Sequence, residues 1–243
     1  MASVLREALT TLRPERGDRH GPLMPMMIAL TLLTGVVDAV SYLRFGHVFV
    51  ANMTGNIVFL GFALGGAQGL SAVTSLVALV SFLAGAVAGG RLGARCAEHR
   101  GHLLRAGTAA QLALLAIALI LALVIGEPLD SGTRYALLVP MALAMGVQNA
   151  TVQRIAVPEL TTTVLTRTLT GLASESRLAG GPGSKAGRRM IAIAAMLLGA
   201  LVGALLVLHV AIAAAIGLAG AVALAVGIAV HLLSSADAPW IKP

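Results

Sequence analysis

The chain has 243 residues, of which 58% are hydrophobic and only 11% are charged, and its mean hydropathy is +0.92. Soluble domains are roughly one quarter charged, so this composition excludes a water-soluble globule and predicts an all-α bundle that crosses a membrane several times. The net charge of +7 would suggest nucleic-acid binding in a soluble protein, but the positive residues lie between apolar runs, and we expect the lipid bilayer rather than nucleic acid as the partner.

The first 21 residues form an arginine-rich segment ahead of the first apolar run. A secretory signal would place a brief apolar stretch and a small-residue cleavage site here, whereas the run that follows is long enough to cross a bilayer. We therefore expect residues 1–21 to be a basic cytoplasmic tail.

Long apolar runs follow at about 23–43, 71–90, 106–126, 135–153 and 190–233. The last run would measure roughly 66 Å as one helix, which is far more than one crossing needs, so we expect it to break near 209–213. The sequence thus predicts six spans, divided into a first membrane unit at 22–126, a second at 127–233 and a C-terminal tail at 234–243.

Two shorter and more polar elements lie at about 48–66 and 158–173. The first contains the string Ala-Asn-Met-Thr-Gly-Asn at 51–56, and the second is rich in threonine, with Thr161, Thr162 and Thr163 near its start. Amides, glycine and β-branched hydroxyl residues weaken a continuous helix. These elements therefore either span the membrane as imperfect helices or turn back inside it.

The distribution of Lys and Arg favours re-entry of both elements. With Arg167 left out, because it lies within an element, re-entry places fourteen of these residues on the side of the termini and two, Arg44 and Arg134, on the other. If every element spans, the division is ten to six, and re-entry of one alone gives nine to seven or eleven to five. Positive residues concentrate on the cytoplasmic side, so we expect six spans with both termini in the cytoplasm.

The order of helix, polar element and glycine-rich helix occurs twice in the chain. Residues 35–39 (Gly-Val-Val-Asp-Ala) parallel residues 146–150 (Gly-Val-Gln-Asn-Ala), and glycines 85 and 89 parallel glycines 199 and 203. With six spans the two copies have opposite orientations, which makes them an inverted repeat. Transporters and some channels of this plan bring discontinuous helices together near the middle of the bilayer, so we expect the two polar elements to form the functional centre.

The same segments resemble the signature of the YoaK-like family of bacterial membrane proteins. The matching motifs are Gly-x-x-Asp-Ala-x-Ser-Tyr-Leu at 35–43, Phe-x-Ala-Asn-Met-Thr-Gly-Asn at 49–56, Gln-Asn-Ala at 148–150 and Thr-Thr-x-Leu-Thr at 162–166. The resemblance covers about 22–233 and implies a multi-pass protein of the bacterial inner membrane. It supplies no substrate, because the function of the family is unknown. The chain departs from the expected pattern at Arg167, where the resemblance implies glycine.

Asp38 is the acidic residue placed deepest within a predicted span. An intramembrane carboxylate is costly unless it is paired or hydrated. Asp38 therefore either binds a cation or a proton, or it bonds the amides of the nearby loop. Arg167 has three alternatives: contact with an anionic solute, a pair with Asp38, or extension towards the lipid headgroups.

The amides and hydroxyls of the polar elements either cap half-helices whose N–H groups point into a cavity or bond neighbouring helices. The candidate solute- or ion-binding residues are Asp38, Asn52, Thr54, Gly55, Asn56, Gln148, Asn149, Thr162, Thr163 and Thr166. We expect no metal site at Cys96, Glu98, His99 and His102, because a standard four-ligand spacing is missing, and no cofactor, because no nucleotide or catalytic motif is present.

The favoured hypothesis is a transporter or channel for a small polar solute, with a path between the two polar elements. The half-helix N-termini favour an anionic solute, and proton coupling through Asp38 is an extension of the hypothesis. The alternatives are an intramembrane enzyme acting on a lipid and an accessory scaffold subunit. Against an enzyme, the chain has no acid–nucleophile pair and no aspartate cluster in the predicted core. The sequence is compatible with a homo-oligomer.

Overall fold

The computed structural model describes residues 2–14, 18, 20–96, 99–160, 162–163, 165–181, 183–234 and 239–241, and within these ranges the regular structure is helical throughout. Six helices of 22–26 residues are long and apolar enough to cross a membrane. They are α2 (Leu23–Arg44), α4 (Ala72–Arg95), α5 (Arg100–Ile125), α6 (Ser131–Ile155), α8 (Ala186–His209) and α9 (Ile212–Leu233). The predicted all-α bundle with six spans is confirmed, and the long C-terminal run breaks at residues 210–211.

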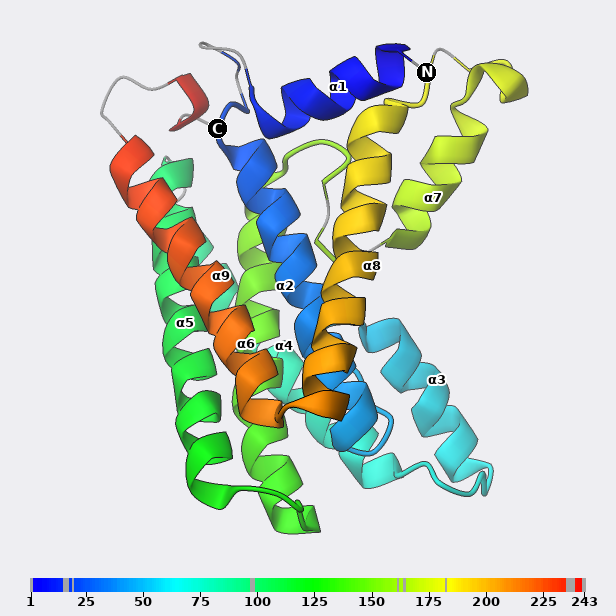
Figure 1. The fold of residues 1–243 in the computed structure, drawn as a ribbon, viewed down its shortest axis with the longest axis vertical. Coiled ribbons are helices and arrows are strands. Elements are labelled where there is room, and N and C mark those ends of the chain that lie inside the picture. The colour runs from blue at the N-terminus through cyan, green and yellow to red at the C-terminus, as the bar shows by residue number, and fades with distance from the viewer. Residues whose placement is uncertain are drawn as a thin grey trace.

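Two half-length helices, α3 (Met53–Leu64) and α7 (Leu165–Ser174), begin near the middle of the bundle (Figure 1). At 1.5 Å per residue they measure roughly 18 Å and 15 Å, which is about half of a hydrocarbon core. After α2 the chain returns to the middle as the first re-entrant loop, residues 45–52, and α3 runs back towards the same end. The second re-entrant loop, residues 156–163, and α7 repeat this path from the end that carries the termini (Figure 1). Both polar elements are therefore re-entrant.

Glycine contacts pair the helices of the two repeats in a matched way. A Cβ atom at Gly85 on α4 would overlap the carbonyl oxygen of Leu143 on α6, and a Cβ atom at Gly199 on α8 would overlap the carbonyl oxygen of Leu32 on α2. Leu143 follows Leu32 by the 111 residues that separate the repeated motifs. Each repeat therefore packs its first span against the glycine-rich span of the other repeat, at a distance that only glycine allows.

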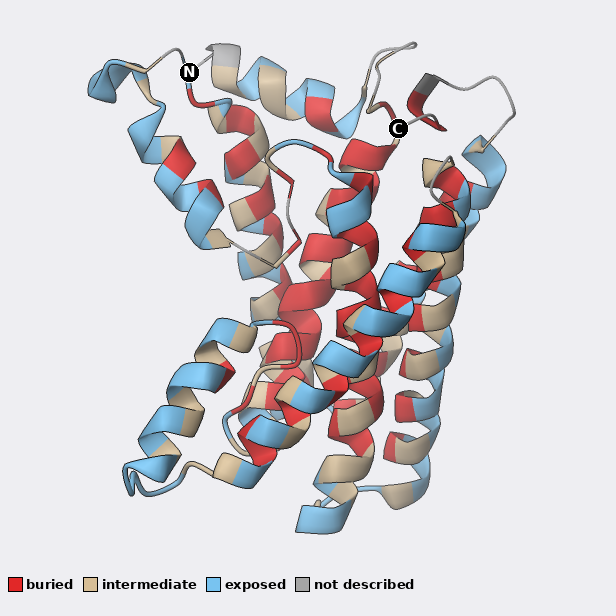
Figure 2. Cartoon of the chain, turned by 180° about the vertical axis from the view of Figure 1, so that it is seen from behind, coloured by how far each residue is buried: buried red, intermediate tan, exposed pale blue. Residues whose placement is uncertain are grey.

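The first spans of the repeats, α2 and α6, form the centre of the bundle and are its most buried long helices (Figure 2). The peripheral helices expose leucine, isoleucine and valine along their outer faces, for example Leu123 on α5 and Leu197 on α8, each 67% exposed. Such faces suit acyl chains, because a membrane-spanning helix needs no polar surface towards lipid.

The N-terminal segment contains a helix that the sequence analysis did not predict. α1 (Ala2–Leu12) lies across the end of the bundle near the starts of α2 and α8 (Figure 1). Two 3-10 turns, η1 (Arg177–Ala179) and η2 (Pro239–Ile241), lie at the same end. At this end α4 also extends beyond its predicted apolar run. Its last turns carry basic residues, which the dipole at a helix C-terminus favours.

Candidate functional site

Asp38 on α2 holds the first re-entrant loop through two main-chain amides. Its Oδ1 atom accepts hydrogen bonds from the N–H groups of Val50 at 3.1 Å and Ala51 at 2.9 Å. The carboxylate is only 6% exposed, and both loop residues are buried. The carboxylate of Asp38 therefore bonds the loop amides, which is one of the two roles predicted for this residue.

Asn56 closes the same loop from the side of α3. Its Oδ1 atom accepts the N–H of Phe49 at 2.8 Å, and its Nδ2 atom donates to the carbonyl of Phe49 at 2.6 Å. A Cβ atom at Gly55 would lie 2.8 Å from the ring of Phe49, so glycine permits this close approach. The rings of Phe49, Tyr42 and Phe59 form a cluster in which each ring contacts the other two. Asn56 and Gly55 thus shape the loop rather than face a cavity.

Gln148 on α6 organises the second re-entrant loop. Its Nε2 atom donates to the hydroxyl of Thr162 at 3.2 Å and to that of Thr34 on α2 at 2.9 Å. Its Oε1 atom accepts from Gln111 on α5 at 2.6 Å. All four residues are buried. This chain of hydrogen bonds joins α2, α5, α6 and the loop. It gives partners to buried polar groups, which would otherwise destabilise the fold.

Asn149 performs in the second repeat the task that Asp38 performs in the first. Its Oδ1 atom accepts a hydrogen bond from the hydroxyl of Thr163 at 2.5 Å, while its Nδ2 atom donates to the carbonyl of Met145 on the same helix. Asn149 follows Asp38 by 111 residues, and Thr163 follows Asn52 by the same number. The two repeats thus fasten their re-entrant loops from a matched position on the first span, through main-chain amides of Val50 and Ala51 in one repeat and through the hydroxyl of Thr163 in the other.

The two fastening points lie one helical turn apart on α2. Thr34, which reaches the second loop through Gln148, is half-way along α2, and Asp38 follows it by four residues on the same face. Both loops therefore end close to the middle of the membrane. The starts of α3 and α7 point to this level from opposite ends (Figure 1), and each brings the partial positive charge of a helix N-terminus.

The remaining candidates stand apart from these networks. Asn52, Thr54 and Thr166 lie at the starts of α3 and α7, where they are exposed, and their side chains make no hydrogen bond within the described part of the chain. Arg167 is exposed beside Thr166 and forms no ion pair with Asp38. Thr161, which we also considered, lies outside the described residues.

Acid–base pairs fix the second loop at the end of the bundle that carries the termini. Glu159 in this loop pairs with Lys185 at 2.9 Å and with Arg188 on α8 at 3.2 Å. Glu175, just after α7, pairs with Arg189 at 2.8 Å. The sequence analysis did not predict these contacts, because 14 to 29 residues separate the partners and neither helical nor strand spacing relates them.

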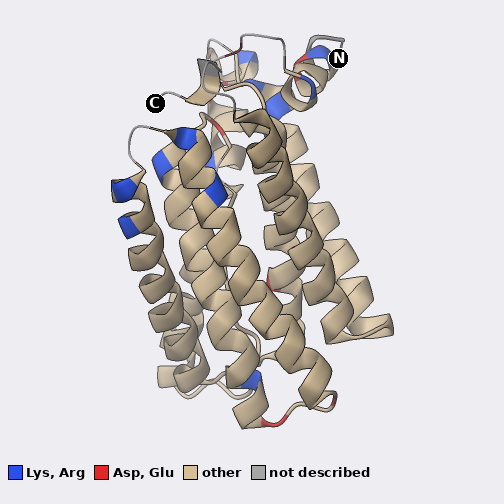
Figure 3. Ribbon diagram, turned by 90° about the vertical axis from the view of Figure 1, so that its left-hand side faces the viewer, with Lys and Arg blue, Asp and Glu red and all other residues tan. Residues whose placement is uncertain are grey.

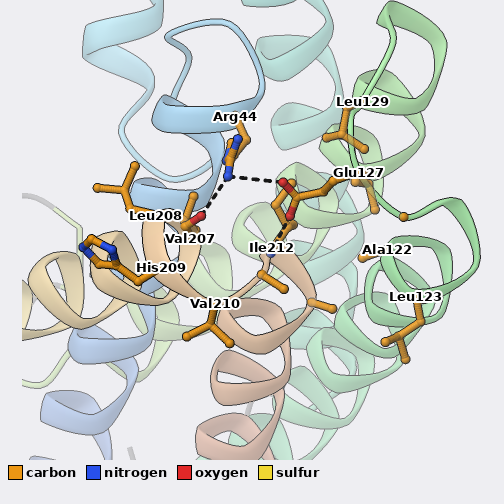
Figure 4. A pocket seen from close by; sticks show the side chains of 14 residues that line it. Arg44, Ala122, Leu123, Glu127, Leu129, Val207, Leu208, His209, Val210 and Ile212 are labelled. Atoms are coloured by element: carbon orange, nitrogen blue, oxygen red, sulfur yellow. Dashed lines mark hydrogen bonds and ion pairs between the residues drawn. The ribbon is translucent and has the colours of Figure 1, made fainter.

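A cavity of about 490 Å³ lies at the opposite end, between the turn of α8 and α9 and the connection of α5 and α6. Arg44 crosses it to pair with Glu127 at 3.2 Å and also donates to the carbonyl of Val207 (Figure 4). Glu127 in turn accepts from the N–H of Ile212 at the start of α9. None of the ten predicted site residues lines this cavity. The cavity is therefore separate from the level near the middle of α2 at which α3 and α7 start, which we call the meeting point of the half-helices.

His99, directly before α5, caps the start of this helix. The Nδ1 atom of His99 accepts the N–H of His102, and the two rings stack at 3.7 Å. Partial burial and the nearby His102 lower the pKa of His99. Glu98 lies outside the described residues. At the other end, hydrogen bonds from Thr133 lower the pKa of Asp130, which caps the start of α6.

The family model described as "Protein of unknown function (DUF1275)" matches residues 26–229. The chain belongs to this family. It is also 31% identical over 150 residues to the UPF0700 transmembrane protein YoaK of Bacillus subtilis (strain 168). That alignment covers 62% of this chain and 65% of the relative, so it spans slightly less than two thirds of the relative's length. No solved structure matches the chain. The family predicted from the motifs is thereby confirmed, and membership carries no substrate with it.

Proposed function

We propose that this protein is a transporter or channel for a small polar solute, whose path passes the starts of α3 and α7. One observation carries the proposal: two half-helices enter an inverted repeat from opposite ends, and their loops are held by two residues one turn apart on α2, Asp38 directly and Thr34 through Gln148. Irregular backbone at this depth is tolerated when it lines a cavity or is buried in protein, and transporters use such paired breaks to bind solutes.

Residues of the site divide between two roles in this proposal. Gln148 and Asn149, together with Asn56, Thr162 and Thr163, position the loops through their hydrogen bonds, and Asp38 does so through one carboxylate oxygen, Oδ1. The side chains free to meet a solute are Asn52, Thr54 and Thr166.

The charge around the meeting point favours an anionic or carbonyl-bearing solute. Two helix N-termini face this level, and Arg167 adds a full positive charge in the first turn of α7. Proton coupling through Asp38 is the finer part of the proposal. Full pH-driven uptake by a folded Asp38→Asn protein in vesicles would remove that part alone.

We assign the end that carries both termini to the cytoplasmic side of the bacterial inner membrane. Lys and Arg residues gather at this end, whereas the other end carries Arg44 and Arg134 among the described residues (Figure 3). This asymmetry follows the positive-inside rule.

Accessibility of mid-membrane cysteines to water tests the path without knowledge of the solute. Asn52→Cys and Thr166→Cys are made in a Cys96→Ser background and treated in intact vesicles with a charged, membrane-impermeant thiol reagent. Leu197→Cys is the matched control, since it is exposed half-way along α8 and faces lipid in this fold. We expect reaction at both test positions to be at least about tenfold faster than at the control, because thiols in hydrocarbon do not form the reactive thiolate. A slow reaction at either position would refute a path between the half-helices.

Solute flux in vesicles then identifies the substrate class. Swelling or uptake is measured with small neutral polar solutes and small anions, using the parent and a Thr166→Val variant. Ser174→Ala, at the far end of α7, controls for a general effect of removing a hydroxyl from this helix. We expect flux of at least one class to fall in Thr166→Val and to persist in Ser174→Ala. Equal flux in both variants would exclude Thr166 from the path.

A further inference from the structure

Helix α1 presents an apolar stripe that faces away from the bundle. Leu5, Leu9 and Leu12 are 60%, 62% and 45% exposed, and their spacing of four and three residues places them on one side of the helix. Thr11, on the other side, is 1% exposed. The helix therefore keeps one face for the protein and leaves the leucine side uncovered by the described part of the chain.

The packed face of α1 fixes its position at the start of α8. A Cβ atom at Gly187 would overlap the carbonyl oxygen of Val4, so the two helices touch through main chain. Glu7 adds a hydrogen bond, because its Oε2 atom accepts the N–H of Gly187 at 3.1 Å. α1 is thus docked on the second residue of a membrane span.

The depth of this contact places α1 at the membrane surface. Met190 is 52% exposed and follows Gly187 by three residues on α8. At 1.5 Å per residue, the first outward-facing apolar side chain of this span therefore lies roughly 5 Å deeper than the contact with α1. Amphipathic helices that bind a membrane surface lie at this boundary between headgroups and acyl chains.

Positive charge adjoins the leucine stripe. Arg6 on α1 and Arg13, which directly follows the last residue of this helix, are exposed and lie seven residues apart, next to the leucines and away from the packed face. Leucines on the uncovered side suit acyl chains, and arginines next to them suit lipid phosphates.

We infer that α1 is an interfacial anchor that binds the anionic lipid surface on the side of the termini. Leu5, Leu9 and Leu12 enter the acyl boundary, while Arg6 and Arg13 contact phosphate groups. This anchoring is independent of any transported solute, since α1 holds none of the residues at the meeting point of the half-helices.

Fluorescence quenching in the full-length protein tests where the leucine stripe lies. Leu9→Cys and, as a matched control one residue on, Thr10→Cys carry a polarity-sensitive fluorophore in a Cys96→Ser background; Thr10 is also exposed but lies further from the leucines. The vesicles contain phosphatidylglycerol. We expect a nitroxide placed high on the acyl chain to quench position 9 about twofold more than position 10, and aqueous acrylamide to quench them in the reverse order. Equal quenching by acrylamide would show a leucine face in water, and quenching of position 9 by neither agent would show a face covered by protein, as in a second copy. Either result would overturn the inference.

Removal of charge tests the anionic headgroup. Each arginine near an anionic surface favours the inserted position by about fivefold. We expect phosphatidylglycerol to increase quenching by the acyl-chain nitroxide in the labelled Leu9→Cys protein, which is the parent here. No increase is expected when Arg6→Gln and Arg13→Gln are added to it. Arg134→Gln, at the other end of the bundle, controls for the change in net charge and should behave as the parent. Quenching that does not respond to phosphatidylglycerol in the parent would refute recognition of anionic lipid.

Discussion

Replacement of Asp38 by alanine removes the acceptor that holds the first re-entrant loop. The N–H groups of Val50 and Ala51 both donate to Oδ1 of Asp38, and these loop residues are 0% and 4% exposed, so water cannot replace the carboxylate without opening the loop. A buried donor left without a partner costs about 1–3 kcal/mol, so two of them cost about 2–6 kcal/mol.

The asparagine variant separates hydrogen bonding from charge. Because both bonds end on one oxygen, the amide of Asp38→Asn retains an acceptor for both N–H groups. The second repeat already uses Asn149 at the matched position. Charge-assisted hydrogen bonds are about twice as strong as neutral ones, so we expect this variant to lose only about 1–2 kcal/mol.

Thermal unfolding in detergent and the reactivity of a cysteine at position 50 measure the two effects. In a Cys96→Ser background, we expect thermal stability to decrease from the parent to Asp38→Asn and further to Asp38→Ala. The cysteine of Val50→Cys should become reactive in the alanine variant alone, since that loop opens. Equal stability of the two Asp38 variants, or an unreactive cysteine in the alanine variant, would refute the role of Asp38 as the residue that fastens the loop.

Three further predictions concern packing, the buried amide chain and a helix cap. Gly85→Ala should destabilise the fold by about 1–3 kcal/mol in thermal unfolding, because its Cβ overlaps main chain, whereas Gly90→Ala on the same helix meets open space and should be neutral; equal effects would contradict the close crossing. Gln148→Ala leaves three buried hydrogen-bond partners without Gln148 and should lower the stability of the fold by about 2–4 kcal/mol in the same assay. Unchanged stability would contradict the importance of these buried hydrogen bonds. Asp130→Ala should lower stability most above about pH 4, because hydrogen bonds from Thr133 lower the pKa of Asp130 and the cap weakens as pH falls through that lowered pKa; a deficit that grows on acidification would reverse the sign.

Much of the architecture could be predicted from the sequence, because a membrane imposes local rules. A span needs about 20 apolar residues wherever it lies, and basic residues report which end faces the cytoplasm. These rules predicted the six spans, a break near 209–213, which the structure places at 210–211, and the re-entry of both polar elements. Gly85 and Gly199, which the sequence analysis identified as parallel positions of the repeat, meet carbonyl oxygens at matched positions in the structure.

Short amphipathic helices fall outside these rules. α1 was missed because it has 11 residues with apolar positions mixed among charged ones, and its packing partner is 180 residues away. The candidate residues lie in or beside the re-entrant loops, but the sequence left open whether each one faces a solute or a neighbouring helix.

The sequence by itself determined which segments enter the membrane, how many cross it and that the chain contains two related halves, since each of these depends on hydrophobicity and charge within a local window. Only the tertiary structure decided what the polar groups bind. Asp38 meets amides 12 and 13 residues away, and Gln148 meets Thr34 across 114 residues. Hydrogen bonds act over about 3 Å, so their partners depend on the folded path of both loops, which composition and periodicity do not specify.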